Sequence, residues 1–211
     1  VDVRKGHKTG FYIDQRENRL LAQKLAREFK ERHGRGMRAL NCFCYTGGFS
    51  LALLGGGAAE VVSVDSSAES LAMAQRNAKR NGFEDSRAQW VQADVFEYLR
   101  QAREEGKEFD LVILDPPKFA SSHRHIERAA RAYKDINLKG LRLVAENGDL
   151  LTFSCSGAMD VDLFQKVIAG AVIDSKREAW MVARLGAGAD HPLMMTCPEG
   201  EYLKGIHLVL R

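Results

Sequence analysis

Apolar stretches of strand length alternate with amphipathic stretches of helical length through most of this 211-residue chain. This alternation predicts parallel strands joined by right-handed crossovers, with helices on both faces of the sheet. Two more strand-like runs end the chain without a helix between them, so the last strand can insert antiparallel. The sequence therefore predicts an α/β fold with a seven-stranded, mostly parallel sheet. The predicted strands are residues 37–43, 60–65, 87–94, 109–117, 149–156, 178–186 and 202–211.

One helix is expected before the first strand, over residues 14–36. Asp14 and Glu17 have the spacing of a capping box, and Gly34 can end the helix. We expect residues 1–36 to form an extended segment and this helix. Both should pack on a core formed by residues 37–211, giving one compact domain.

Membrane and disulfide-rich classes are disfavoured by the composition. No apolar run approaches the ~20 residues of a membrane helix, and the first ten residues lack the apolar core of a secretory signal. The four cysteines suit a reducing, cytoplasmic setting better than a disulfide scaffold. The Cys42-x-Cys44 pair has no His or Cys partner nearby in sequence, so no metal site is predicted.

Positive charge is concentrated in two segments, although the net charge is only +3. Residues 1–38 hold eleven Lys or Arg against five Asp or Glu, and residues 118–142 form a second basic run. Such clusters can bind phosphate backbones, and lying along one rim they would form an RNA-binding surface. Two solvated helix faces are the alternative.

Polar side chains gather at the ends of the predicted strands. They are Asn41–Gly47, Asp65, Asp94, Asp115-Pro116-Pro117 and Ser154-Cys155-Ser156. In parallel sheets the carboxyl ends of the strands form the ligand-binding edge. The sequence therefore predicts one crevice into which four polar strand ends and a thiol face.

Asp65 suits a nucleoside cofactor, because a carboxylate after the second strand can accept both hydrogen bonds of a ribose diol. It could instead cap the following helix. The glycine turn before it, ending in Gly47 and Gly48, allows close backbone approach but is not G-x-G-x-x-G, which disfavours a dinucleotide. Asp94 can bond an adenine amino group or cap the next helix.

Asp115 and Cys155 are the candidates for chemistry. Two prolines after Asp115 give the strand a rigid exit, which can hold the carboxylate toward a flat ligand. Cys155 stands where an apolar strand meets a turn. It is either a small buried hydrophobe or a nucleophile at the rim of the crevice.

Several of these motifs together resemble the ribosomal large subunit methyltransferase I family, which are class I S-adenosylmethionine-dependent RNA methyltransferases. The resemblance spans nearly the whole chain. It rests on the segments 8–19 (KTGFYIDQRENR), 41–47, 115–119 (DPPKF), 153–157 (FSCSG), 162–174, 190–192 (DHP) and 198–205 (PEGEYLKG).

The resemblance implies a Rossmann-like fold, S-adenosylmethionine as cofactor and large-subunit ribosomal RNA as substrate, methylated at cytosine C5. In that family an RNA-binding PUA domain precedes the catalytic domain, so we expect this chain to be the catalytic part alone. A homodimer is left open.

The resemblance also implies residue roles. Cys155 would attack C6 of cytosine, and Asp115 would hold the N3 proton. Pro116 stands where two related enzyme types carry a second cysteine, so product release must use another base. The residues expected to bind the cofactor are Arg16, Asn41, Phe43, Tyr45, Thr46, Gly47, Asp65, Ser66, Asp94 and Asp115.

Three other functions remain open from the sequence. A guanine-N methyltransferase of the same fold would need no thiol, so Cys155 discriminates against it. A non-catalytic RNA-binding module would lack a cofactor pocket. A nicotinamide oxidoreductase is the least favoured, because the glycine fingerprint is missing.

Overall fold

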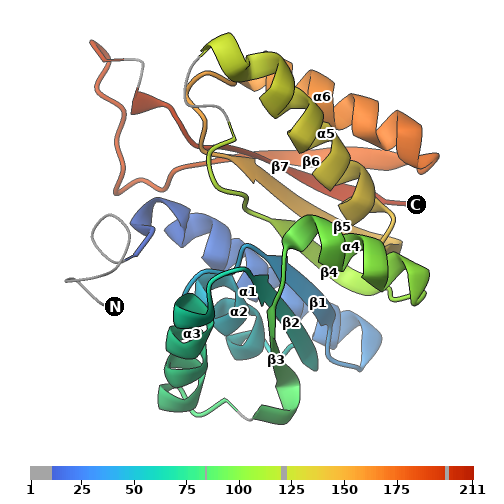
Figure 1. The fold of residues 1–211 in the computed structure, drawn as a ribbon. Coiled ribbons are helices and arrows are strands. Elements are labelled where there is room, and N and C mark those ends of the chain that lie inside the picture. The colour runs from blue at the N-terminus through green and yellow to red at the C-terminus, as the bar shows by residue number, and fades with distance from the viewer. Residues whose placement is uncertain (1–10, 84, 120–122, 198–199) are drawn as a thin grey trace.

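A seven-stranded sheet runs through the centre of the computed structural model, which describes residues 11–83, 85–119, 123–197 and 200–211 (Figure 1). The strand order is β3-β2-β1-β4-β5-β7-β6, with β7 antiparallel to both of its neighbours. This confirms the predicted mostly parallel sheet with one antiparallel strand. The strands are β1 (Arg38–Cys42), β2 (Glu60–Asp65), β3 (Ala88–Gln92), β4 (Phe109–Leu114), β5 (Val144–Ser154), β6 (Ala179–Gly186) and β7 (Lys204–Leu210).

Helices cover both faces of the sheet, as predicted (Figure 1). They are α1 (Arg16–His33), α2 (Gly48–Gly55), α3 (Ala68–Arg80), α4 (Val95–Glu104), α5 (Ile126–Leu141) and α6 (Val161–Ser175), with short 3-10 turns at Ile13–Gln15, Asp85–Arg87 and His123–His125. Strand β4 shows the two layers, since Val112 and Leu114 pack toward α4, α5 and α6, and Leu111 and Ile113 pack toward α1 and α2.

Helix α1 starts later than predicted, and its capping box is absent. Asp14 lies in the preceding 3-10 turn, and the N-cap residue Gln15 makes no capping hydrogen bond through its side chain. The fully buried face is formed by Ala22 and Ala26. Because these side chains are small, α1 can approach α2 closely. A Cβ atom added to Gly56, the C-cap residue of α2, would lie only 2.9 Å from the Cβ atom of Ala26.

The boundary between α5 and β5 also differs from the expected one. The sequence predicts a helix over residues 123–146 and a turn at Asn147-Gly148. In the structure the helix ends at Leu141, and β5 already begins at Val144, before that dipeptide. Asn147 has a φ of 59°, and the pairing of β5 with β4 shifts register there. The expected turn is therefore an irregularity within one long strand.

The two basic segments do not share a rim, and that prediction is wrong for the described residues. Helix α1, which carries six of the eleven Lys and Arg residues of the first segment, packs on one face of the sheet. Helix α5, which carries most of the second, packs on the opposite face (Figure 1). Residues 1–10, which belong to the first segment, lie outside the described residues. None of the helices in the described ranges has both the length and the hydrophobicity of a bilayer span.

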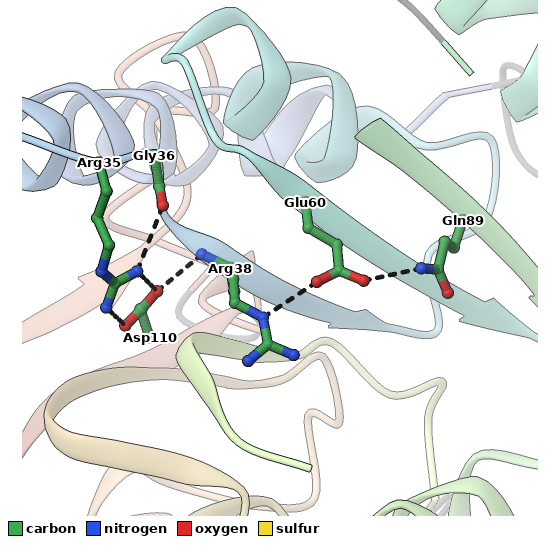
Figure 2. A network of polar contacts seen from close by, with 6 residues as sticks. All are labelled: Arg35, Gly36, Arg38, Glu60, Gln89 and Asp110. Atoms are coloured by element: carbon green, nitrogen blue, oxygen red, sulfur yellow. Dashed lines mark hydrogen bonds and ion pairs between the residues drawn. The ribbon is translucent and has the colours of Figure 1, made fainter. Parts of the chain in front are cut away.

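A polar network links the amino-terminal ends of the central strands, on the side away from the predicted crevice (Figure 2). Arg35 donates two hydrogen bonds of 2.8 Å to the carboxylate of Asp110, which also accepts from the backbone N–H of Arg38 at 2.8 Å. The Arg38 side chain pairs with Glu60 at 3.0 Å, and Gln89 donates to the same carboxylate. The network joins the segment that follows α1 to strands β1 to β4.

Asp110→Asn should lower the free energy of unfolding by about 2 kcal/mol at pH 7, because a buried carboxylate loses the charge-assisted hydrogen bonds that it accepts from the half-exposed Arg35 and from the backbone N–H of Arg38. Burial raises the pKa of Asp110, but the hydrogen bonds from Arg35 and Arg38 outweigh it and lower the pKa below its ordinary 3.8. The stabilisation by the Asp110 carboxylate is therefore complete at pH values above 3.8, the pKa of an ordinary aspartate. It is lost as the pH falls through the lower pKa that Asp110 has in the folded protein. Urea unfolding from pH 7 to pH 3 measures this.

The matched control is Glu60→Gln, since the Glu60 side chain is more exposed than that of Asp110 (29% against 9%). Its effect at pH 7 should be under about 1 kcal/mol. A penalty for Asp110→Asn that stays constant down to pH 3 would contradict the electrostatic origin.

Candidate active site

A cavity of about 760 Å³ opens at the carboxyl ends of β1, β2, β4 and β5, the edge predicted from the sequence. Its volume lies within the range of small-molecule sites. The segment before α1 and the residues before β7 complete its wall. The predicted residues that line it are Phe43, Tyr45, Thr46, Asp65, Ser66, Asp115 and Cys155.

The turn after β1 has an unusual backbone. Phe43 and Tyr45 have φ values of 57° and 47°, in the left-handed region that non-glycine residues seldom adopt. The backbone N–H of Tyr45 donates to Asp65 at 2.8 Å, and Gly47 follows with a φ of 84°. Such strain persists where the surroundings enforce it and is common at ligand sites.

Asp65 connects the turns after β1 and β2. One carboxylate oxygen accepts from Tyr45, and the other accepts from the backbone N–H of Ser67 at 2.9 Å. Helix α3 is capped by Ser67, whose hydroxyl accepts from Ser70 at 3.1 Å. Asp65 is thus fixed in orientation without serving as the cap, and it keeps its position in the cavity wall.

Two predicted residues lie behind the wall. The Asn41 side chain is buried and donates to the Ser50 hydroxyl at 2.8 Å, and Ser50 in turn bonds Ser63 at 2.7 Å. Gly47 is the N-cap of α2, and a Cβ there would lie 3.0 Å from that of Ala74. Both support the turn between β1 and α2.

Asp94 also does not line the cavity. Its exposed side chain accepts from the backbone N–H of Glu97 at 3.1 Å and caps α4. The structure thus gives it the second of the two roles that its sequence position allows.

Arg16, which was expected to bind the cofactor, points away from the cavity. Arg19 is the arginine that lines the cavity instead. The Arg16 side chain is half exposed and pairs with Glu17 at 2.9 Å and Asp190 at 3.3 Å. Arg19, one turn further on, lines the cavity and donates to the carbonyl of Tyr12 at 2.7 Å. Burial lowers the pKa of Arg19, and the nearby carboxylates Asp14 and Asp115 act in the opposite direction.

The thiol of Cys155 lies beside the proline exit of β4. Its sulfur is 4.0 Å from the carbonyl oxygen of Pro116, the length of a weak S–H···O contact, and the residue is partly exposed to the cavity. Asp115 precedes that proline and lines the same cavity. A carboxylate and a thiol on adjacent strands therefore share one site.

Aromatic packing fixes both loops. Phe119, which ends the proline exit, packs on Tyr133 of α5 with ring centroids 4.8 Å apart. The Tyr133 hydroxyl accepts from Ser154, the residue before Cys155, at 2.9 Å. Burial raises the pKa of Tyr133 to about 12, so this hydroxyl stays neutral at physiological pH. The chain of contacts sets the positions of Asp115 and Cys155 relative to each other.

The remaining thiols differ from Cys155. Cys44 also lines the cavity, but both Cys42 and Cys44 are buried, and burial strongly raises the pKa of each. Cys197 is exposed and does not line the cavity. Within the described part of the chain, no three His, Cys, Asp or Glu side chains form a cluster able to hold a metal ion.

Sequence reasoning missed the far wall of the cavity. Tyr202 donates a 2.5 Å hydrogen bond to Asp14, and both residues line the site. Helical spacing could have indicated Arg19, because it shares a face with Ala22 and Ala26. No local signal pairs Asp14 with Tyr202, which are 188 residues apart.

The sheet is Rossmann-like, and a cavity with the Asp65 carboxylate in its wall lies at the carboxyl ends of the strands. This is the architecture of a class I methyltransferase. The chain belongs to the S-adenosylmethionine-dependent methyltransferase family, whose model matches residues 1–192. Over 206 residues it is 50% identical to Ribosomal RNA large subunit methyltransferase I of Aeromonas hydrophila, and over 205 residues it is 51% identical to the protein of that name from Photobacterium profundum.

The chain spans about half the length of these curated relatives, covering 50% of each, while the matches cover 98% and 97% of the chain. Among solved structures it is similar to SMU.776 complexed with SAH, with a TM-score of 0.81 and 27% identity. That match covers 95% of this chain and 50% of the other.

The cofactor of this family is S-adenosylmethionine, and the cavity suits it. Asp65 presents a fixed carboxylate of the kind that binds a ribose diol, and Ser66 lies beside it in the wall. Arg19 provides a partly buried cation for a carboxylate. Phe43 and Tyr45 add aromatic surface.

Proposed function

We propose that this chain is the catalytic part of an RNA methyltransferase that forms 5-methylcytosine in large-subunit ribosomal RNA through a covalent bond to Cys155. One observation carries the proposal. The thiol of Cys155 and the carboxylate of Asp115 line the same cavity as Asp65, the expected cofactor residue. A nitrogen methyltransferase needs no such thiol.

The proposed cofactor contacts follow from the cavity wall. Asp65 would bind the ribose hydroxyls, and Arg19 would pair with the cofactor's carboxylate in place of Arg16. When bound, S-adenosylmethionine supplies an electrophilic methyl group. The backbone turn from Phe43 to Thr46 would line the cofactor, and Asp94 is not retained as a contact because it caps α4 outside the cavity wall.

Cys155 would activate the base. Carbon 5 of cytosine is weakly nucleophilic, so the thiolate first adds to C6 and the electron pair of the C5–C6 double bond becomes available at C5. Asp115 would hold the proton on N3 that stabilises this adduct. After C5 takes up the methyl group, a base removes the C5 proton and the re-formed double bond expels the thiolate.

The substrate class is supported by the relatives that are about 50% identical and named for ribosomal RNA large subunit methylation. A cytoplasmic location would follow from that substrate. For the complete protein, we also propose a PUA domain that supplies RNA affinity. Whether the complete protein is a homodimer is left open.

The proposal is tested by identifying the product. The protein is incubated with methyl-labelled S-adenosylmethionine and large-subunit ribosomal RNA, and the RNA is digested to nucleosides for mass spectrometry. We expect labelled 5-methylcytidine. Labelled N-methylguanosine would establish the guanine alternative, and cofactor binding without any labelled nucleoside would point to a non-catalytic RNA-binding module.

A further inference from the structure

Lys204 is a buried lysine beside the catalytic turn. It is 5% exposed, begins β7, and lies opposite Ser154 in the antiparallel pairing of β5 with β7. Its ammonium donates to the carbonyl oxygens of Ser156 at 2.8 Å and Met159 at 2.6 Å. Among the described residues, no carboxylate forms an ion pair with it within 4 Å.

The two hydrogen bonds fasten the turn that follows Cys155. The carbonyl of Ser156 also accepts from the backbone N–H of Met159 at 3.1 Å, so Lys204 closes a loop that is already turned back on itself. Neutral carbonyls satisfy the ammonium's donors but do not neutralise its charge. An uncompensated buried cation is costly, and proteins keep such groups where an anion is present or forms.

The Cys155 thiol is the group that can provide this anion. Burial lowers the pKa of Lys204, and the strongest opposing electrostatic effect comes from Cys155, ahead of Glu201 and Asp160. The other titratable groups around the thiol are Tyr12, Tyr133, Tyr202 and Asp115, which are neutral or negative.

Arg19 lines the same cavity, but its guanidinium donates to the carbonyl of Tyr12 and is balanced by the carboxylates of Asp14 and Asp115. Lys118 is the other nearby cation, and it also lies in the cavity wall. Its side chain is exposed, so solvent screens its charge. Lys204 is therefore the fixed positive charge best placed to act on the thiol.

We propose that Lys204 is the positioning residue of Cys155: it fastens the turn after the thiol and holds a buried positive charge that favours the thiolate at neutral pH. The proposal deepens the proposed function and rests on Cys155 being the nucleophile. A free thiol is mostly protonated near neutrality, and an adjacent cation is an established way of activating it.

The test measures the thiol without RNA or cofactor. The rate of Cys155 alkylation by iodoacetamide is followed from pH 5 to pH 10 by peptide mass spectrometry. Lys204→Gln keeps donor N–H groups but removes the charge, and it should raise the midpoint of the profile by about one pH unit, a tenfold loss of reactivity at low pH. Lys204→Arg keeps the charge and should leave the midpoint near that of the wild type.

If the role of Lys204 were purely structural, the alkylation midpoints of Lys204→Gln and the wild type would be equal. That result would overturn the proposal. Lys139→Met, which removes a lysine of α5 paired with Asp135, is the matched control and should not move the midpoint. If Lys204→Gln does not fold by circular dichroism, the wild type decides alone. A midpoint at or above the ~8.5 of a free cysteine contradicts the proposal.

The outcome is separable from the proposed function. A low midpoint of the alkylation profile that depends on Lys204, together with full turnover in Cys155→Ala, would refute the role of Cys155 as the nucleophile. It would still support the activation of the Cys155 thiol by Lys204. An unchanged midpoint with an inactive Cys155→Ala would refute only the role of Lys204.

Discussion

Cys155→Ala should reduce methyl transfer to background, a loss of at least about ten-thousand-fold in single-turnover rate. Without the thiol, carbon 5 of the cytosine is never activated, because Cys44, the other thiol in the described cavity wall, is buried and its pKa is strongly raised by burial. The affinity for S-adenosylmethionine should change less than about threefold, because the proposed cofactor contacts come from α1 and from the ends of β1 and β2 rather than from Cys155. Rapid-quench methylation and calorimetry measure the two quantities.

Cys197→Ala is the matched control, because Cys197 is exposed and lies outside the cavity wall. It should retain the wild-type rate. Normal turnover in Cys155→Ala would refute the covalent mechanism and favour methylation of a nitrogen.

Asp65→Ala should weaken S-adenosylmethionine binding by about 2–4 kcal/mol, or roughly 30- to 1,000-fold. Part of this loss comes from the two hydrogen bonds to the ribose hydroxyls. The rest comes from the turn at Tyr45, whose left-handed backbone is held by the same carboxylate at 2.8 Å. Calorimetric titration of the cofactor gives the change directly.

Asp65→Asn separates these contributions, since the amide keeps one acceptor oxygen for a backbone N–H but loses the charge. It should bind the cofactor more tightly than Asp65→Ala and less tightly than the wild type. Asp162→Ala removes an exposed carboxylate paired with Lys166 and serves as the control without effect. Wild-type affinity in Asp65→Ala would remove this residue from the cofactor site.

Much of the site was predictable because parallel strands bring their carboxyl ends to one edge. Asp65, Asp115 and Cys155 are 90 residues apart from first to last, yet Asp65 is the last residue of β2, and Asp115 and Cys155 directly follow β4 and β5. Their convergence follows from topology alone, without side-chain detail. The alternation of strands and helices was therefore enough to predict both the sheet and the site.

The far wall of the cavity needed tertiary information. Whether Arg16 or Arg19 enters the cavity depends on the rotation of α1, and Ala22 and Ala26 set that rotation by packing on the sheet. Leu21, Leu25 and Phe29 recur every four residues, which predicts the buried face of α1, but in the structure they are only partly buried against the core. The most buried face is that of Ala22 and Ala26. Small residues at a helix contact carry little hydrophobic signal.

Charge along the sequence was also misleading. The basic run of α5 is largely paired, as in Lys134 with Asp174 at 2.8 Å and Lys139 with Asp135 at 2.7 Å. A crossover connection places helices on either face of the sheet, so two basic segments need not lie together. Lys204 was overlooked for the opposite reason, because its role depends on the register of β7 against β5.

Trapping of the enzyme on RNA that contains 5-fluorocytosine tests the covalent mechanism most directly. Fluorine at C5 cannot leave as a proton does, so the final elimination fails and the enzyme should stay attached to the RNA. Digestion and mass spectrometry should then find the base, methylated and fluorinated at C5, bonded through C6 to the sulfur of Cys155. Cys42→Ala, Cys44→Ala and Cys197→Ala should trap equally well. A linkage to one of those cysteines, or no covalent complex under conditions where normal RNA is methylated, would contradict the proposed role of Cys155.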